Sequence, residues 1–129
     1  MRETAVFICA LFASSCASPE GATPSQALQA CARGAAHVEV EGRGTVTRVL
    51  GTRTSASGVH EGFFLRMDRI SIRVEDNTDI TGPIPLRAGE PIQLRGQYEC
   101  SDGVIHWTHH DPAFRHAGGY IIAGGRRYS

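Results

Sequence analysis

The chain has 129 residues, a formal net charge of zero, and 41% hydrophobic against 20% charged residues. This composition is that of one globular domain and excludes an intrinsically disordered chain. Thirteen basic residues, all of them arginine, balance thirteen acidic ones, so we expect no broad basic face of the kind that grips nucleic acid, and at most a local arginine patch.

The first residues of the chain have the pattern of an export signal. A charged start precedes an apolar run from Ala5 to Ala13, which is too short to span a bilayer as a stable helix. Ala13-Ser14-Ser15-Cys16 resembles the lipobox of bacterial lipoproteins, although the usual aliphatic residue three places before the cysteine is missing. We predict a signal peptide over residues 1–16 and a tether over residues 17–24.

Export would place the remaining domain, residues 25–129, in the periplasm or on the outer membrane, anchored to the membrane through a lipid on Cys16. The alternatives are secretion without a lipid and a plain apolar N-terminal helix. In an oxidising compartment we expect the two cysteines of the domain, Cys31 and Cys100, to form a disulfide, the alternative being two buried thiols that do not meet. The sequence holds neither a CxxC pair nor a Cys/His quartet, so a structural zinc knuckle is not expected.

A short helix and a long bent strand are expected at the start of the domain. Residues 25–36 are rich in helix formers, with Ser25 available as the N-cap. Apolar and polar residues alternate between His37 and Leu50, which is typical of a strand. Two glycines inside this strand, Gly42 and Gly44, predict a bulge or a sharp bend.

Further short strands, separated by turn signals, complete an all-β pattern. Their number and order resemble the OB-fold, so we predict a small five- or six-stranded OB-like barrel with a short N-terminal helix, the alternative being a five-stranded sandwich. The expected elements after the first strand are a polar loop over 51–58, a hairpin of strands 59–67 and 70–74, a turn-rich connection over 76–90, strands over 92–100 and 104–110, and a short strand around 120–122.

The segment 104–112, VIHWTHHDP, holds three of the six histidines and the only tryptophan. On a regular strand, alternate side chains share a face, and Ile105 and Trp107 are expected in the core. His106 and His110 would lie about 13 Å apart, too far to hold one metal ion by themselves. Any divalent transition metal therefore needs ligands from elsewhere in the chain. The candidate ligands are Asp76, Asp79, His106, His109 and His110.

Most of the mature chain, from about Val40 to Tyr128, resembles a family of exported bacterial proteins catalogued as domain of unknown function 3465. The family's long motif I-H-W-T-H-H-D-P is matched in full by residues 105–112. Its shorter motifs, H-Q-x-F, H-N-x-D-L, G-E-Y-E-W and H-x-x-G-W, have weaker counterparts at 60–63, 76–80, 96–100 and 116–120. The resemblance implies export and a shared site, and it implies no particular reaction.

Three of the departures from the family pattern matter most. Asp76 stands where the pattern has histidine, Glu61 where it has glutamine, and Cys100 where it has tryptophan. An aspartate keeps the capacity to bind a metal but removes a neutral proton shuttle, which puts in doubt any mechanism that relies on that imidazole. The cysteine is consistent with the predicted disulfide to Cys31.

The first functional hypothesis is an exported, monomeric OB-like binding module for a polar ligand, either an oligonucleotide or an oligosaccharide. OB-type surfaces commonly combine stacking aromatic side chains with cationic ones. The expected ligand-binding residues are His60, Arg66, Arg73, Asn77, Tyr98, His106 and His116.

The alternative hypothesis is a metal-dependent hydrolase of phosphodiesterase type, in which histidines and acids bind the metal and transfer protons. Its expected catalytic residues are His109, His110 and Asp111. The sequence has no G-x-S-x-G, H-E-x-x-H or phosphate-binding glycine loop to support it. A third hypothesis is a structural or metal-buffering envelope protein, whose histidines form hydrogen bonds in the barrel wall or sequester an ion.

Overall fold

The computed structural model describes residues 21–129, so the predicted signal peptide, the Cys16 lipobox and the first half of the predicted tether lie outside the described residues. Within the described range, no helix combines the length and the apolar character needed to cross a membrane. The elements of this range are α1 (Pro24–Ala32), β1 (His37–Ser55), β2 (Gly58–Met67), β3 (Ile70–Asn77), α2 (Thr78–Thr81), β4 (Pro91–Glu99), β5 (Val104–His106), β6 (Tyr120–Ala123) and β7 (Arg126–Tyr128).

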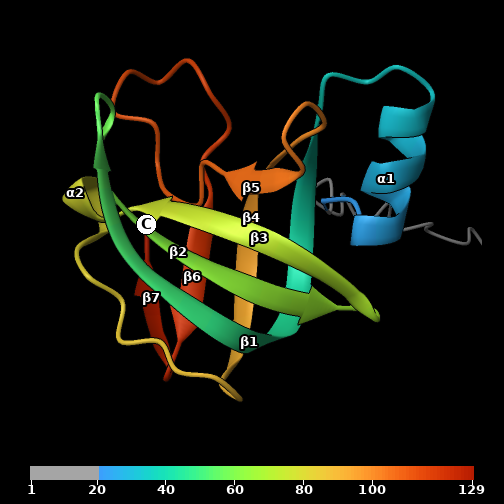
Figure 1. The fold of residues 1–129 in the computed structure, drawn as a ribbon. Helices are drawn as coiled ribbons and strands as arrows, with labels where there is room; N and C mark the ends of the chain where they lie inside the picture. Colours follow the sequence, from blue (N-terminus) through green and yellow to red (C-terminus); the bar gives the residue numbers. More distant parts are fainter. Residues whose placement is uncertain (1–20) are drawn as a thin grey trace, which may run out of the picture.

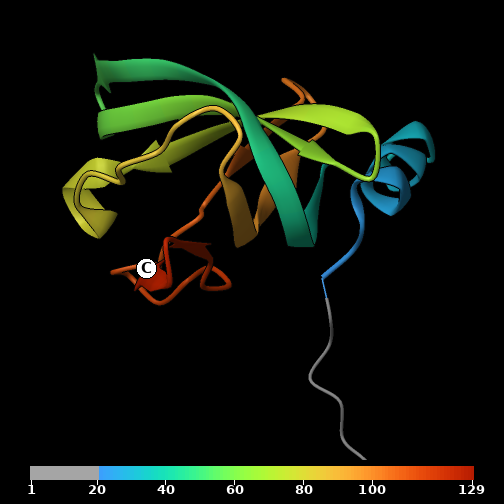
Figure 2. The same cartoon turned by 90° about the horizontal axis from the view of Figure 1, so that it is seen from below.

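Five strands close into a ring in the order β1-β2-β3-β5-β4, because β1 pairs with both β2 and β4. Neighbours in the ring are antiparallel except β3 and β5, which are parallel. In Figure 1 the sheet of β1, β2 and β3 crosses in front of β4 and β6, and Figure 2 shows the same two layers from below. The predicted all-β, OB-like barrel with a short N-terminal helix is confirmed. The hairpin β6–β7 extends the ring beside β4.

The strand β1 belongs to both sides of the barrel. It pairs with β4 up to Thr45 and with β2 from Thr45 onward. A Cβ added at Gly44 would lie 2.6 Å from the carbonyl oxygen of Arg66, so a side chain does not fit where the strand crosses over β2. The change of partner at Thr45, next to Gly44, confirms the predicted bend, whereas the bulges of β1 lie farther along, between Val46 and Arg48 and between Val49 and Gly51. The predicted loop over 51–58 is wrong for most of its length, because β1 continues to Ser55 in register with β2.

The alternating apolar residues of the predicted strands form the core. Phe63 and Leu65 of β2, Val74 of β3 and Leu94 of β4 are fully buried, and Ile105 of β5 packs among them. This is the arrangement that period-two alternation predicts, because every second side chain of a strand points into the barrel.

Thr23, and not Ser25, caps the N-terminus of α1. The Thr23 hydroxyl accepts a hydrogen bond from the backbone N–H of Gln26 at 3.3 Å, and the Gln26 side chain accepts one from the Thr23 N–H at 2.8 Å. This reciprocal capping box satisfies two N–H groups that have no partner within the helix. The helix ends at Ala32, four residues earlier than predicted, and Gly34 takes a positive φ of 98° after it.

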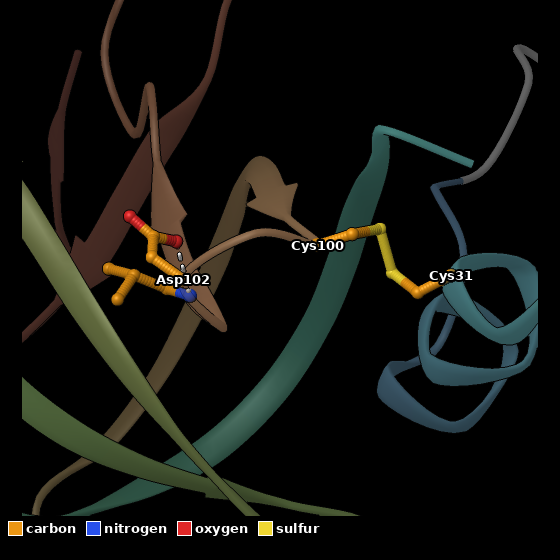
Figure 3. Close-up of a disulfide and its surroundings, with 4 residues drawn as sticks. Cys31, Cys100 and Asp102 are labelled. Carbon is orange, nitrogen blue, oxygen red and sulfur yellow. Dashed lines mark hydrogen bonds between the residues drawn. A yellow bond between two sulfur atoms is a disulfide. The ribbon is translucent and has the colours of Figure 1, made fainter. Parts of the chain in front are cut away.

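The predicted disulfide between Cys31 and Cys100 is present and joins α1 to the end of β4, with Cα atoms 5.5 Å apart (Figure 3). Beside it, the Asp102 carboxylate accepts a hydrogen bond from the Val104 N–H at 3.1 Å and shapes the turn into β5. The covalent link matters because α1 buries only Pro24 and Ala27 against the barrel.

The predicted strand over 104–110 is wrong beyond His106. β5 has only three residues, and Trp107 takes a positive φ of 55°, a left-handed conformation that few non-glycine residues adopt and that interrupts strand pairing. The expected alternation of faces therefore stops at His106. Trp107 is half-buried outside the core, which corrects its predicted place, whereas Ile105 is fully buried as expected.

Candidate functional site

A pocket with a volume of about 320 Å³ lies at one end of the β2–β3 hairpin. The β1–β2 turn, the end of β3, helix α2 and the segment after β5 surround it, and Figure 1 shows these elements gathered at the upper left of the barrel. Its lining residues are Ser57, His60, Glu75, Asn77, Ile80, His106, Trp107, His109, Asp111 and Pro112.

Two of the imidazoles that line the pocket are held in the same way. His60 Nδ1 lies 3.2 Å from the carbonyl oxygen of Gly58, and His109 Nδ1 lies 2.6 Å from that of His110. A carbonyl oxygen only accepts, so each Nδ1 carries the hydrogen, and the Nε2 of a neutral ring is left as an acceptor. No described residue forms a hydrogen bond with either Nε2 atom. The pocket thus offers two oriented acceptors to the hydroxyl or amino groups of a ligand.

The indole of Trp107 forms one wall and is supported by His116. The two rings stack with centroids 4.4 Å apart and an interplanar angle of 12°. His116 is itself positioned by the side-chain oxygen of Gln97, whose amide N–H₂ group donates to Glu99 on the same strand. This chain of contacts ties the indole to β4, so a flat ring in the pocket would meet a fixed aromatic surface.

Glu75 forms a charged part of the wall on β3. Its side chain is only 3% exposed, and it accepts a hydrogen bond from Arg73 Nε at 2.9 Å. Arg53 Nη2, from β1, lies 3.7 Å from the same carboxylate oxygen. Arg73 is therefore paired directly with this carboxylate at the edge of the pocket, and the more exposed Arg53 lies near it without a hydrogen bond.

A second carboxylate, Asp76, lies beneath the pocket on the inner face of β3. It is fully buried and accepts hydrogen bonds from the hydroxyls of Thr81 at 2.5 Å and Thr108 at 2.6 Å. Burial raises the pKa of Asp76, and the two hydroxyls and the neighbouring His109 and His60 act in the opposite direction. Burial also raises the pKa of Glu61, the cross-strand partner of Asp76, and the Asp76 charge adds to that rise.

We expect Asp76→Asn to raise the melting temperature at pH 7 and to weaken its dependence on pH. In the folded protein the pKa of Asp76 lies above its ordinary value of 3.8, so the folded state binds the proton more tightly than the unfolded chain. This carboxyl therefore favours folding less as the pH rises through the window between the two values. An asparagine avoids the buried charge, and its amide can donate to a threonine hydroxyl.

Thermal denaturation between pH 3.5 and pH 8 measures this effect. The difference between variant and parent should be largest at neutral pH and should shrink as the pH approaches about 3.8, the ordinary value. Asp68→Asn, in the exposed turn between β2 and β3, is the matched control and should leave the profile unchanged. A difference in melting temperature between variant and parent that is equal at every pH would contradict the raised pKa of Asp76.

Asp111 shapes the loop that carries the histidines. Its carboxylate accepts hydrogen bonds from the backbone N–H groups of Ala113 at 2.8 Å and Arg115 at 2.7 Å. The bond from Ala113 is the main cause that lowers the pKa of Asp111. Both oxygens are thus committed to the turn after Pro112, which is the local hydrogen bonding expected of an aspartate before a proline turn.

The structure brings only part of the predicted site together. His60, Asn77, His106, His109 and Asp111 line the pocket. The remaining predicted residues are not part of the lining. His110 is exposed, and Arg66 and Arg73 lie on the outer face of the sheet. His116 is behind Trp107, Asp79 accepts a hydrogen bond from the Val59 N–H, and Tyr98 is in the core.

Tyr98 is the clearest correction among the ligand-binding residues. It is 8% exposed and points into the barrel with the other inward residues of β4, so a ligand outside the barrel does not reach its ring. The predicted metal ligands are not assembled either. Across residues 21–129 no three His, Cys, Asp or Glu side chains are grouped so that they could hold a metal ion. In particular, Asp76 is committed to two threonines and His106 contacts Asp102 at 3.2 Å.

Five lining residues were not among the predicted site residues of any kind, namely Ser57, Glu75, Ile80, Trp107 and Pro112. Trp107 had a signal in the sequence, as the only tryptophan within a histidine-rich motif, but the strand prediction placed it in the core. Its left-handed backbone conformation, which moves the indole out of the core, has no sequence signal of its own.

Comparison with known proteins gives one match. The family model described as "Protein of unknown function (DUF3465)" matches residues 8–129. No curated protein and no solved structure matches the chain.

Proposed function

The chain belongs to this family of proteins of unknown function, and from that premise we propose that it is a binding module of the cell envelope, whose pocket holds one ring unit of a polar chain ligand. The ligand is an oligonucleotide or an oligosaccharide. The observation that carries this proposal is the pocket itself, in which a fixed indole faces imidazole, amide and carboxylate groups.

The position of the pocket supports this proposal. It lies on the β2–β3 hairpin beside the β1–β2 turn, and OB-type barrels bind oligonucleotides and oligosaccharides on the face of strands 2 and 3 and on the adjoining loops. Its volume of about 320 Å³ is at the lower end of the range of ligand-pocket volumes. This volume suits one base or sugar ring rather than a large compact ligand.

The chemistry of the lining supports it as well. A base or a sugar ring has a flat face that can stack on Trp107 and edge groups that hydrogen-bond to His60, His109 and Asn77. A metal-dependent hydrolase is not proposed, because the predicted metal ligands do not converge within the described chain.

We also propose that the protein is exported and anchored through a lipid on Cys16. The Cys31–Cys100 disulfide supports export, because disulfides persist in oxidising compartments and are rare in the cytosol. Mass spectrometry of the mature protein from the membrane fraction tests the anchor, and an unmodified N-terminus that begins elsewhere would contradict it.

The fluorescence of the single tryptophan provides a direct test of the pocket. Titration with short single-stranded oligonucleotides and with neutral and acidic oligosaccharides should quench or shift the emission of Trp107 for a true ligand. Trp107→Ala should weaken binding of that ligand by roughly tenfold or more, measured by anisotropy of the labelled ligand, because stacking on one aromatic ring contributes about 1–3 kcal/mol.

Leu28→Ala is the matched control for this test, since Leu28 is an exposed apolar residue on α1, away from the pocket. Its affinity should equal that of the parent. If no oligonucleotide or oligosaccharide changes the fluorescence, or if Trp107→Ala binds as tightly as the parent, the proposed function is wrong.

A further inference from the structure

The outer face of the β1–β2–β3 sheet carries a row of arginines that continues from the pocket. Across the strands, Arg48 of β1 is paired with Phe64 of β2, which in turn is paired with Arg73 of β3. Arg53 lies opposite His60, next to the pocket, and Arg66 lies two residues beyond Phe64. In Figure 1 this sheet is the front layer of the barrel.

The same face is poor in acidic residues. The acids within the strands β2 and β3 are Glu61, Glu75 and Asp76, of which Glu61 and Asp76 lie on the inward-facing side, and Asp68 lies in the turn that joins the two strands. Only Glu75 is outward, so four arginines on this face meet one carboxylate. The chain as a whole has no net charge, and this face therefore concentrates positive charge that the rest of the molecule balances.

An aromatic ring lies in the middle of the arginines. Phe64 is half-buried between its two arginine neighbours and lies four positions along β2 from His60 in the pocket wall. This spacing is about 13 Å along a strand. The outward position between them is Gly62, which is buried beneath the side chains of Leu50 and Glu75, so a ligand extending from the pocket to Phe64 would pass over Leu50. Aromatic surfaces at two points, with guanidinium groups around them, match the stacked bases and the phosphates of an extended strand.

We infer that the ligand of the pocket is single-stranded nucleic acid, with one base on Trp107, another on Phe64, and its phosphates on the arginines of the outer sheet face. This inference rests on the proposed function and narrows it. A neutral oligosaccharide would stack on the same rings, but it carries no negative charge that could pair with the arginines of the outer sheet face. Glu75 has a positioning role, because it holds Arg73 by hydrogen bonds next to the pocket, where the nucleic acid would leave it.

The test removes charge from the face without touching the pocket or Glu75. The double variant Arg48→Gln/Arg66→Gln changes two exposed arginines, and Arg33→Gln/Arg87→Gln makes the same change in net charge away from the sheet. Anisotropy of labelled oligothymidylate and oligouridylate, each about ten nucleotides long, is measured at several salt concentrations. Trp107 fluorescence reports on the pocket in the same samples.

We expect the face variant to bind either strand roughly tenfold more weakly than the parent and the control variant to bind like the parent. The slope of log K against log salt concentration should fall by about 1.4 in the face variant, because each phosphate contact with a single strand contributes about 0.7. Similar effects on DNA and RNA would mean that both are ligands through the shared phosphodiester chemistry.

Other outcomes would overturn the inference and can be told apart from failure of the proposed function. If a neutral oligosaccharide quenches Trp107 and neither strand binds, the pocket is functional but the inference is wrong. The same holds if an acidic polysaccharide binds more tightly than both strands, or if the face and control variants lose the same affinity. If nothing binds at all, the proposed function and the inference fail together.

Discussion

Loss of the Cys31–Cys100 disulfide is expected to lower the free energy of unfolding by about 4 kcal/mol. The two cysteines are 69 residues apart in the chain, and a link across so long a segment restricts the unfolded chain strongly, according to the loop-entropy account. In the folded protein it also holds α1, which buries only Pro24 and Ala27. Urea denaturation of Cys31→Ala/Cys100→Ala beside the parent measures the difference.

The parent under reducing conditions is the control for this experiment, and it should unfold at nearly the same urea concentration as the double variant. The variant should keep the ring of β1 to β5, since no strand of the ring depends on α1 for a neighbour. Its native circular dichroism and Trp107 emission should therefore be retained in the absence of urea. Equal stability of the oxidised parent and the variant would show that the disulfide does not restrain the unfolded chain as expected.

Gly119→Ala is expected to destabilise the protein by about 3 kcal/mol and to disrupt the pocket. A Cβ at Gly119 would lie 2.5 Å from the carbonyl oxygen of Arg95 and 2.9 Å from the Thr108 Cα, and closer still to the carbonyl oxygen of Trp107. All of these are backbone atoms, which cannot rotate away as a side chain can. The Gly119 N–H also donates to the carbonyl of His109 at 2.8 Å, so the displaced segment is the one that carries the histidines.

The neighbouring glycine is a matched control for that variant. A Cβ at Gly118 would have its nearest neighbour, the Cα of His110, 4.0 Å away. Gly118→Ala should therefore leave stability and ligand binding close to those of the parent. Melting temperature and Trp107 emission distinguish the two variants, and a Gly119→Ala protein with parental values of both would contradict the packing described for this segment.

The sequence was most informative in the strands whose successive side chains point alternately into the core and into the solvent. Phe63, Leu65 and Val74 were predicted inside because every second position of their strands is apolar, and burial of those positions leaves one register available to the hairpin. The disulfide followed from the number of cysteines and the export signal rather than from geometry, and it is present. Prediction failed at Trp107, where a left-handed residue interrupts the strand.

The sequence by itself determined the all-β class, the bend of β1, the disulfide partners and the family to which the chain belongs, because each of these depends on local patterns or on cysteine pairing. Only the tertiary structure decided which polar residues meet. His60 and His109 are 49 positions apart, and they line one pocket because the ring of strands and the bend at Trp107 bring them there. Asp76 of β3 and Tyr98 of β4 were buried by the same closure of the barrel, since the direction of a side chain relative to a closed sheet is a property of the whole ring.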